Sequence, residues 1–298
     1  MWTTKGYWMI INLALTLSVP AVQAFHASRE HPDSGRTEKE LETIRKSFAF
    51  EAAAARSVLE IDNVFGSIEV VSSPSSQAQV VIAKTITAES KERLEAARRE
   101  VTLDITQTDN EVKLFVNGPF RRRCWCDSAE SREDGYLVKM DFQLQVSPNT
   151  ELKLKTVTDG HIRVEGVAGN YSVRNVNGPV EMLDVAGSGL ARTVNGSIKV
   201  TFRDNPRGNS EFASLNGAVE LQFARNLSAD FRFKTLNGEV YSDYPLTALP
   251  PRPPLQERRN GKLVFRADRY TGGRAGAGGP EIKVENLNGD IRVLERKG

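Results

Sequence analysis

The chain has 298 residues, of which 39% are hydrophobic and 26% are charged, so it can bury a core and its composition does not require wholesale disorder. Its 40 basic and 38 acidic side chains leave a net charge of +2, which argues against a domain that binds nucleic acid through overall positive charge. With three histidines and two cysteines, a His-based catalytic centre or a Cys/His metal cage is disfavoured. We therefore expect no metal and no cofactor.

Residues 1–24 have the pattern of a secretory signal peptide. Lys5 supplies the positive flank, the apolar run extends from Met9 to Val19, and small residues precede a cleavage site after Ala24. An N-terminal membrane anchor is the alternative, but the run is shorter than the roughly 20 residues that a span needs. The prediction is an exported protein, periplasmic, cell-surface or secreted, with no membrane span after cleavage.

Two segments of different character follow the signal peptide. Residues 25–47 are polar and charged, and we expect a flexible leader with at most a helical turn or two. Residues 48–150 show the period-two apolar spacing of half-buried strands. They also contain one predicted helix over 88–100, where Leu94, Ala97 and Val101 leave a narrow apolar stripe.

The region 151–298 is dominated by an internal repeat centred on an Asn-Gly pair. Five segments align without gaps, namely RNVNGPVEM, RTVNGSIKV, ASLNGAVEL, KTLNGEVYS and ENLNGDIRV. Their central pairs are Asn177-Gly178, Asn195-Gly196, Asn216-Gly217, Asn237-Gly238 and Asn288-Gly289, and looser copies surround Gly66 and Gly160. Self-similarity at about 20 residues indicates stacked units. A Pro-rich and Gly-rich insertion at 245–279 interrupts the series and is predicted to be loop.

An Asn-Gly pair between apolar strands is typical of a two-residue hairpin. Here a hairpin would pair Val176 with Pro179 and place Asn175 beside Val180, so apolar residues would face polar ones. A corner between two sheets avoids this conflict, because the two strands need not pair. We therefore predict an all-β fold, a β-solenoid of about 20-residue rungs, and keep a meander of hairpins as the alternative.

The corner hypothesis predicts one stacked core along the rungs, formed by Val176, Val180, Val194, Ile198, Leu215, Val219, Leu236 and Val240. The Asn-Gly residues are interpreted as structural turns, because both tolerate positive φ and stacked asparagine side chains can hydrogen-bond one another. Binding of a cation or a sugar by a ladder of asparagines is the alternative.

A signal peptide, paired strands, one helix and iterated T-V/L-N-G-x-I/V-x-V rungs resemble the bacterial putative-adhesin family of domains of unknown function. The resemblance covers about residues 58–298 and is clearest in GPEIKVENLNGDIRVLE, residues 279–295. It implies a right-handed β-solenoid-like fold in an envelope or secreted protein, and it carries no catalytic residues. The Pro-rich insertion at 245–260 and the CWC loop depart from a plain run of rungs.

Motifs of known catalytic centres are absent, including phosphate loops, HExxH, GxSxG and EF-hand loops. Enzymes that cleave polysaccharides use paired carboxylates, and the candidates are Asp159, Glu165, Glu181 and Asp184. Charge on the solvent face of strands is the competing interpretation. His161 follows a rung corner with no second histidine nearby, so we interpret it as a surface residue.

The basic loop around the CWC sequence is the most unusual local segment. Its candidate binding residues are Arg121, Arg122, Arg123 and Trp125, which could grip an anionic polymer by bidentate contacts and stacking. A solvated hairpin loop is the alternative. Cys124 and Cys126 are a disulfide candidate in an oxidising compartment, with intermolecular pairing as the competing outcome.

Together these features predict a secreted or envelope-associated protein that binds or scaffolds and does not catalyse. The expected partners are an anionic envelope polymer, a glycan or another envelope protein, and not nucleic acid. The alternatives are a carbohydrate-active β-solenoid enzyme that uses paired carboxylates, and an envelope-stress accessory protein.

Overall fold

A computed structural model describes residues 36–50, 57–121, 134–266 and 269–297. The predicted signal peptide and residues 122–133 of the basic loop lie outside these ranges. Within the described ranges no helix is both long and apolar enough to cross a membrane. Strands dominate, with one α-helix and one short 3-10 helix, so the predicted all-β class with a single helix is confirmed for this part of the chain.

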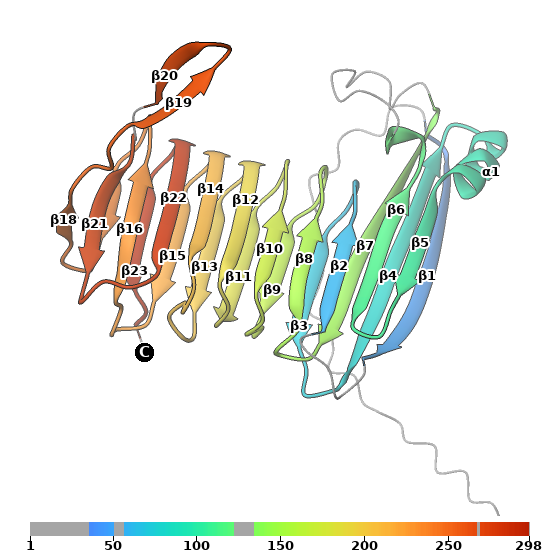
Figure 1. The fold of residues 1–298 in the computed structure, drawn as a ribbon. Helices are drawn as coiled ribbons and strands as arrows, with labels where there is room; N and C mark the ends of the chain where they lie inside the picture. The colour runs from blue at the N-terminus through green and yellow to red at the C-terminus, as the bar shows by residue number, and fades with distance from the viewer. Residues whose placement is uncertain (1–35, 51–56, 122–133, 267–268, 298) are drawn as a thin grey trace, which may run out of the picture. The chain divides into compact units, whose positions relative to one another are not determined.

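The strands form two large mixed sheets and one separate hairpin (Figure 1). The ten-stranded sheet contains, in spatial order, β1 (Glu38–Ala49), β4 (Gln77–Ala88), β7 (Tyr136–Val146), β3 (Ile68–Ser72), β9 (Ile162–Glu165), β11 (Val180–Val185), β13 (Ile198–Phe202), β15 (Val219–Phe223), β23 (Ile291–Glu295) and β17 (Val240–Ser242). The eleven-stranded sheet contains β18 (Thr247–Leu249), β21 (Thr271–Ala275), β16 (Ala229–Lys234), β22 (Glu281–Asn288), β14 (Ser210–Asn216), β12 (Gly189–Asn195), β10 (Tyr171–Arg174), β8 (Glu151–Lys155), β2 (Val58–Asp62), β6 (Glu111–Asn117) and β5 (Thr102–Gln107). The hairpin pairs β19 (Leu255–Arg259) with β20 (Lys262–Arg266).

Period-two apolar spacing decides which face of each strand is buried. In β7 the residues at alternate positions from Tyr136 to Val146 are buried, while the polar residues between them are half-buried or exposed. The inner faces of the two sheets bury one common cluster that includes Ile68, Ile198 and Phe212. The opposite faces carry the charged residues and are the surfaces available to a ligand.

The single α-helix, α1 (Lys91–Glu100), begins three residues later than predicted. Ser90 caps it by accepting a hydrogen bond from the backbone N–H of Arg93 at 3.3 Å. Leu94 and Ala97 are buried on its inner side, which confirms the predicted apolar stripe. The predicted flexible leader also ends earlier than residue 47, because residues 38–49 form β1 and pair antiparallel with β4.

The Asn-Gly pairs join strands of different sheets. β12 ends at Asn195 in the eleven-stranded sheet, and β13 begins at Ile198 in the ten-stranded sheet. Successive repeats pair in parallel, so that Ile198 lies in register with Val180 on one side and Val219 on the other. These pairs are therefore corners, and the alternative of two-residue hairpins is wrong.

The spatial order of the repeats differs from their order in the chain. The last repeat, β22 and β23, lies between β14 and β15 on one side and β16 and β17 on the other (Figure 1). The insertion before it is not all loop, because it contains β18 to β21, and β21 pairs antiparallel with β16. The sheets are also not closed into complete coils, which departs from a regular β-solenoid.

The predicted stacked core is correct for only part of its members. Val180, Ile198 and Val219 are fully buried, whereas Leu215 and Leu236 are 41% and 71% exposed. Val240 is also exposed, and Val176 and Val194 are half-buried. For Val176, Val194, Leu215 and Leu236, strand alternation explains the error. Before each corner, the side chain that points inward belongs to the polar residue that precedes the Val or Leu.

These inward polar residues satisfy the backbone of the neighbouring rung. The Thr193 hydroxyl donates to the carbonyl oxygen of Gly178 at 2.9 Å. The Ser214 hydroxyl donates in the same way to Gly196 at 2.8 Å. A buried carbonyl without a partner is costly, so the small polar residue in each repeat stabilises the corner.

Candidate functional site

The repeat asparagines form a continuous ladder of side-chain hydrogen bonds. Asn195 Nδ2 donates to Asn177 Oδ1 at 2.7 Å, and Asn216 Nδ2 donates to Asn195 Oδ1 at 2.8 Å. Asn288 and Asn237 continue the ladder with bonds of 2.7 Å each. Because the amides bind one another, this geometry supports the structural interpretation of the asparagines.

The outer face of the ten-stranded sheet is balanced in charge. Arg163 lies in register with Glu69 and Glu181 on its two sides. Lys199, Glu220 and Arg292 continue the alternation across the next strands, as the registers of Glu181 with Lys199, of Lys199 with Glu220 and of Glu220 with Arg292 show. Opposite charges on neighbouring strands stabilise a sheet, so this face needs no ligand to balance it.

The carboxylates proposed for catalysis mostly have structural partners. Arg163 forms ion pairs with both Glu165 and Glu181. Asp184 lies 3.0 Å from the guanidinium of Arg296 and 3.6 Å from that of Arg203. Asp159 is an exposed corner residue with a φ of 53°. These contacts support the interpretation of the carboxylates as charged strand faces.

His161 lies at the outer face of the ten-stranded sheet, between two partners. Its Nε2 is 3.1 Å from Glu69 Oε1, and its Nδ1 is 3.1 Å from Ser67 Oγ. The hydrogen bond from His161 lowers the pKa of the Glu69 carboxyl, and desolvation opposes this effect. No other histidine lies in the described ranges, so the histidine acts as a local hydrogen-bonding bridge.

The outer face of the eleven-stranded sheet carries an unbalanced row of cations. Arg174 lies in register with Lys155 on β8 and with Arg192 on β12. We call Lys155, Arg174 and Arg192 the cation row. Neighbouring strands are about 4.8 Å apart, and like charges directly opposite each other destabilise a sheet. This row therefore carries an electrostatic cost that the other sheet avoids.

The acidic residues near the cation row neutralise it only in part. Lys155 Nζ lies 3.3 Å from Asp62 Oδ2, but Asp62 also binds Arg121 at 2.8 Å. Arg192 forms an ion pair with Glu211. Among the described residues the guanidinium of Arg174 has no acidic partner. Four cations thus face two carboxylates, and Arg174 stands between the other two members of the row.

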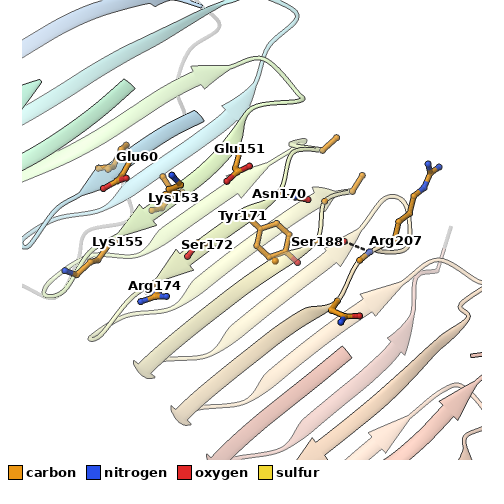
Figure 2. Close-up of a pocket in the computed structure, with 18 of the residues that line it drawn as sticks. Glu60, Glu151, Lys153, Lys155, Asn170, Tyr171, Ser172, Arg174, Ser188 and Arg207 are labelled. Carbon is orange, nitrogen blue, oxygen red and sulfur yellow. Dashed lines mark hydrogen bonds between the residues drawn. The ribbon is translucent and has the colours of Figure 1, made fainter. Parts of the chain in front are cut away.

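Two hollows on this face meet at the cation row. One has a volume of about 880 Å³ and the other about 690 Å³, and Lys155 and Arg174 line both. Figure 2 shows Lys155 and Arg174 on adjacent strands of the larger hollow, with Arg207 farther along it. Within the described chain, Arg207 also lacks an acidic partner. Both volumes are in the range of ligand sites.

An exposed apolar row runs beside the cation row. Its members are the residues two positions before the repeat glycines, namely Val176, Val194, Leu215, Leu287 and Leu236, and all of them line the smaller hollow. Four of them, Val176, Val194, Leu215 and Leu236, are residues that the sequence placed in the core. We call them the apolar row.

Of the candidate binding residues in the basic loop, Arg121 is the one that the structure describes, and it is the last residue of the short 3-10 helix Pro119–Arg121. Its guanidinium donates to Asp62 Oδ1 and to the Asp62 carbonyl, both at 2.8 Å, and lies 4.3 Å from the centroid of the Phe115 ring. These contacts hold Arg121 and the end of the 3-10 helix against the sheet and favour a structural role for Arg121. Arg122, Arg123, Cys124, Trp125 and Cys126 lie outside the described residues.

The sequence contains a signal for the cation row, which lies just outside the Asn-Gly pairs. In RNVNG and RTVNG the residue four positions before the glycine is arginine. Aligned repeats place such residues side by side in a parallel sheet. Only the register shows that Lys155 joins them, because its repeat has one additional residue before Gly160.

The part of the chain that the structure describes contains no group of three or more His, Cys, Asp or Glu residues that could hold a metal ion. Neither a family model nor a curated protein sequence matches the chain.

Solved structures provide distant likenesses. A putative cell adhesion protein from Clostridium sporogenes is 11% identical, with 86% of this chain and 100% of that chain covered and a TM-score of 0.39. A putative adhesin from Bacteroides fragilis is 12% identical, with 86% and 97% covered and a TM-score of 0.37. A putative lipid binding protein from Parabacteroides distasonis is 10% identical, with 87% and 98% covered and a TM-score of 0.26. At these scores the likenesses carry no argument about function.

Proposed function

We propose that this protein is an exported, non-catalytic binding protein of the adhesin type, which holds an anionic envelope polymer on the outer face of its eleven-stranded sheet. The repeats serve as a rigid scaffold, a right-handed β-solenoid variant, that places Lys155, Arg174 and Arg192 side by side on neighbouring strands. The observation that carries the proposal is the cation row, in which Arg174 has no acidic partner among the described residues.

The spacing of the row suits a repeated anion. A polymer that crosses the strands would meet one cation about every 4.8 Å. Guanidinium groups bind phosphate or carboxylate oxygens in a bidentate manner, and such charge-assisted hydrogen bonds are stronger than neutral ones. A bound polyanion would also relieve the repulsion between Arg174 and its two neighbours. Binding therefore stabilises an arrangement that is unfavourable in the free protein.

A non-catalytic role agrees with the geometry of the carboxylates. Glu165, Glu181 and Asp184 each form an ion pair with an arginine, which is the arrangement of a charged strand face rather than of two carboxyl groups that share a substrate. The cation row offers positive charge and hydrogen-bond donors, which are the requirements for holding an anion. Attachment to an envelope polymer would give the exported chain its place at the cell surface.

The test compares two double variants with the same loss of charge. Arg174→Ser/Arg192→Ser removes two members of the cation row, and Lys199→Ser/Arg292→Ser removes two cations from the balanced face of the other sheet. Retention of each protein on immobilised long-chain polyphosphate is measured at several salt concentrations. We expect the first variant alone to bind weakly and to show a flatter salt dependence. Equal retention of the two variants would overturn the proposal.

A further inference from the structure

The apolar row raises a question that anion binding alone does not answer. A polyanion requires cations and gains nothing from Leu215 and Leu236, which are 41% and 71% exposed. Exposed apolar residues in a contiguous row, bordered by polar ones, mark a surface that another apolar group covers. Arg174 and Arg192 of the cation row lie two residues before Val176 and Val194 of the apolar row, and both rows line one hollow of about 690 Å³.

We infer that the anion held by the cation row carries a hydrocarbon chain, which lies along the apolar row. The ligand class is an anionic amphiphile with a phosphate or carboxylate head. This inference rests on the proposed function, because it assigns the head of the ligand to Arg174 and its neighbours.

On the two rungs that precede the apolar row, the chain itself covers the corresponding apolar residues. Val64 and Val157, which occupy the corresponding position on the two preceding rungs, are only 9% and 5% exposed. Phe120 of the 3-10 helix is partly buried against the core, and its ring meets that of Phe65, the residue after Val64, edge-to-face at 5.8 Å. From Val176 onward the described residues provide no such cover. A ligand would continue the apolar cover that Phe120 begins.

The length of the open row fits an acyl chain. Its five residues lie within or two residues after the neighbouring strands β10, β12, β14, β22 and β16, so the row is about 19 Å long. The hydrocarbon of one membrane leaflet is roughly 15 Å thick, which is half of the bilayer core. A single extended chain of that length therefore covers about three of the four strand spacings of the row, from Val176 to Leu287.

The charges give the ligand a direction. The cation row ends at Arg192, and the next residues in the same register are the uncharged Ala213 and then Glu285. Lys234, one strand farther, lies 3.8 Å from Glu285, so these two charges compensate each other. The head therefore lies at Lys155 and Arg174, where the two hollows meet, and the chain extends toward Leu236. Arg269 lies at the rim of this far end.

The experiment measures binding of monomeric dodecyl phosphate to the mature full-length protein by calorimetry. Ethyl phosphate provides the same head without the chain, and dodecyl maltoside provides the same chain with an uncharged head. We expect dodecyl phosphate to bind at least about tenfold more tightly than either, because both rows contribute to its affinity. Equal binding of dodecyl phosphate and ethyl phosphate would overturn the inference.

Variants separate the two rows. Leu215→Gln/Leu236→Gln changes exposed residues of the apolar row, and Leu263→Gln/Phe265→Gln changes equally exposed residues on the β19–β20 hairpin as a control. The first should weaken dodecyl phosphate binding about tenfold or more and leave polyphosphate retention unchanged. Arg174→Ser/Arg192→Ser should weaken both. The hairpin control should change neither.

The outcomes distinguish this inference from the proposed function. Polyphosphate retention that depends on the cation row, without any gain from the alkyl chain, refutes the hydrocarbon chain and leaves the proposed function standing. Dodecyl phosphate binding that needs the leucines but not the arginines refutes both. Binding to phosphatidylglycerol vesicles without binding of monomeric dodecyl phosphate indicates docking to a membrane and refutes a single bound amphiphile.

Discussion

Gly196 approaches the carbonyl oxygen of Gly178 so closely that a Cβ at position 196 would lie 2.2 Å from that oxygen. Gly217 stands in the same relation to Gly196, also at 2.2 Å, and Gly238 to Gly289 at 2.0 Å. Gly196 does not have a positive φ, whereas Gly178 and Gly217 do. Close approach of stacked backbones, rather than φ alone, therefore requires glycine at the corners.

Replacing Gly196 with alanine should destabilise the protein by about 3 kcal/mol or more, because the obstructing atom is a backbone oxygen that cannot rotate away. The measurement is the free energy of unfolding in denaturant. Gly208→Ala is the matched control, since a Cβ there would meet only the side chain of Ser188 at 3.3 Å. We expect it to cost less than about 1 kcal/mol. Equal losses would refute the close-approach argument.

One aspartate placed on the inner face of a sheet and another placed on an outer face test which residues form the core. Ile198→Asp buries an unpaired charge between Val180 and Val219 and should cost about 4 kcal/mol or more. Leu215→Asp changes an exposed residue and should cost less than about 1 kcal/mol. Chemical denaturation of both variants is the check. A large loss of unfolding free energy in Leu215→Asp would show that Leu215 is a core residue and would contradict its exposed position.

The contact between Glu69 and His161 predicts a dependence on pH. The folded pKa of Glu69 lies below its ordinary value of 4.5, chiefly because His161 donates a hydrogen bond to it. A depressed carboxyl pKa stabilises the fold above pH 4.5, and this stabilisation is lost as the pH falls through the folded pKa. In His161→Ala an NMR titration should show the pKa of Glu69 nearer 4.5. An unchanged pKa would exclude His161 as the cause.

Removal of the last repeat should damage a distant part of the chain. Strands β22 and β23 separate β14 and β15 from β16 and β17, so a chain that ends at residue 279 leaves both neighbours with unpaired edges. We expect rapid proteolysis within residues 224–279 of the truncated protein. Replacing residues 255–266 by a Gly-Ser linker removes only the separate β19–β20 hairpin and should leave the protein resistant. Equal sensitivity would contradict the inserted position of the last repeat.

The two cysteines remain open to a direct test. Cys124 and Cys126 lie outside the described residues, and export predicts that they are oxidised. Mass spectrometry of the non-reduced secreted protein should show an internal disulfide, because effective concentration favours the neighbouring thiol over another molecule. A disulfide-linked dimer would point to intermolecular pairing. Two free thiols would contradict both the disulfide and the predicted export.

The sequence by itself determined the local architecture of this protein. Period-two spacing identified the strands, the stripe of Leu94 and Ala97 identified the helix, and the mismatch of Asn175 with Val180 favoured corners over hairpin turns. These features depend on neighbouring residues, whose periodicity sets the buried face of each element. The asparagine ladder was also predictable, because identical residues at a fixed period stack in a parallel sheet.

Only the tertiary structure decided which residues face outward at the corners and which rungs are neighbours. The sequence predicted that Val176 and Leu215 are core residues. In the structure Asn175 and Ser214 point inward instead, and their side chains donate hydrogen bonds to glycine carbonyl oxygens on the adjacent rung. Pairing between strands distant in the chain placed Arg174 beside Lys155 and inserted the last repeat before β16. Such contacts depend on register and on backbone hydrogen bonds between rungs, which no local pattern encodes.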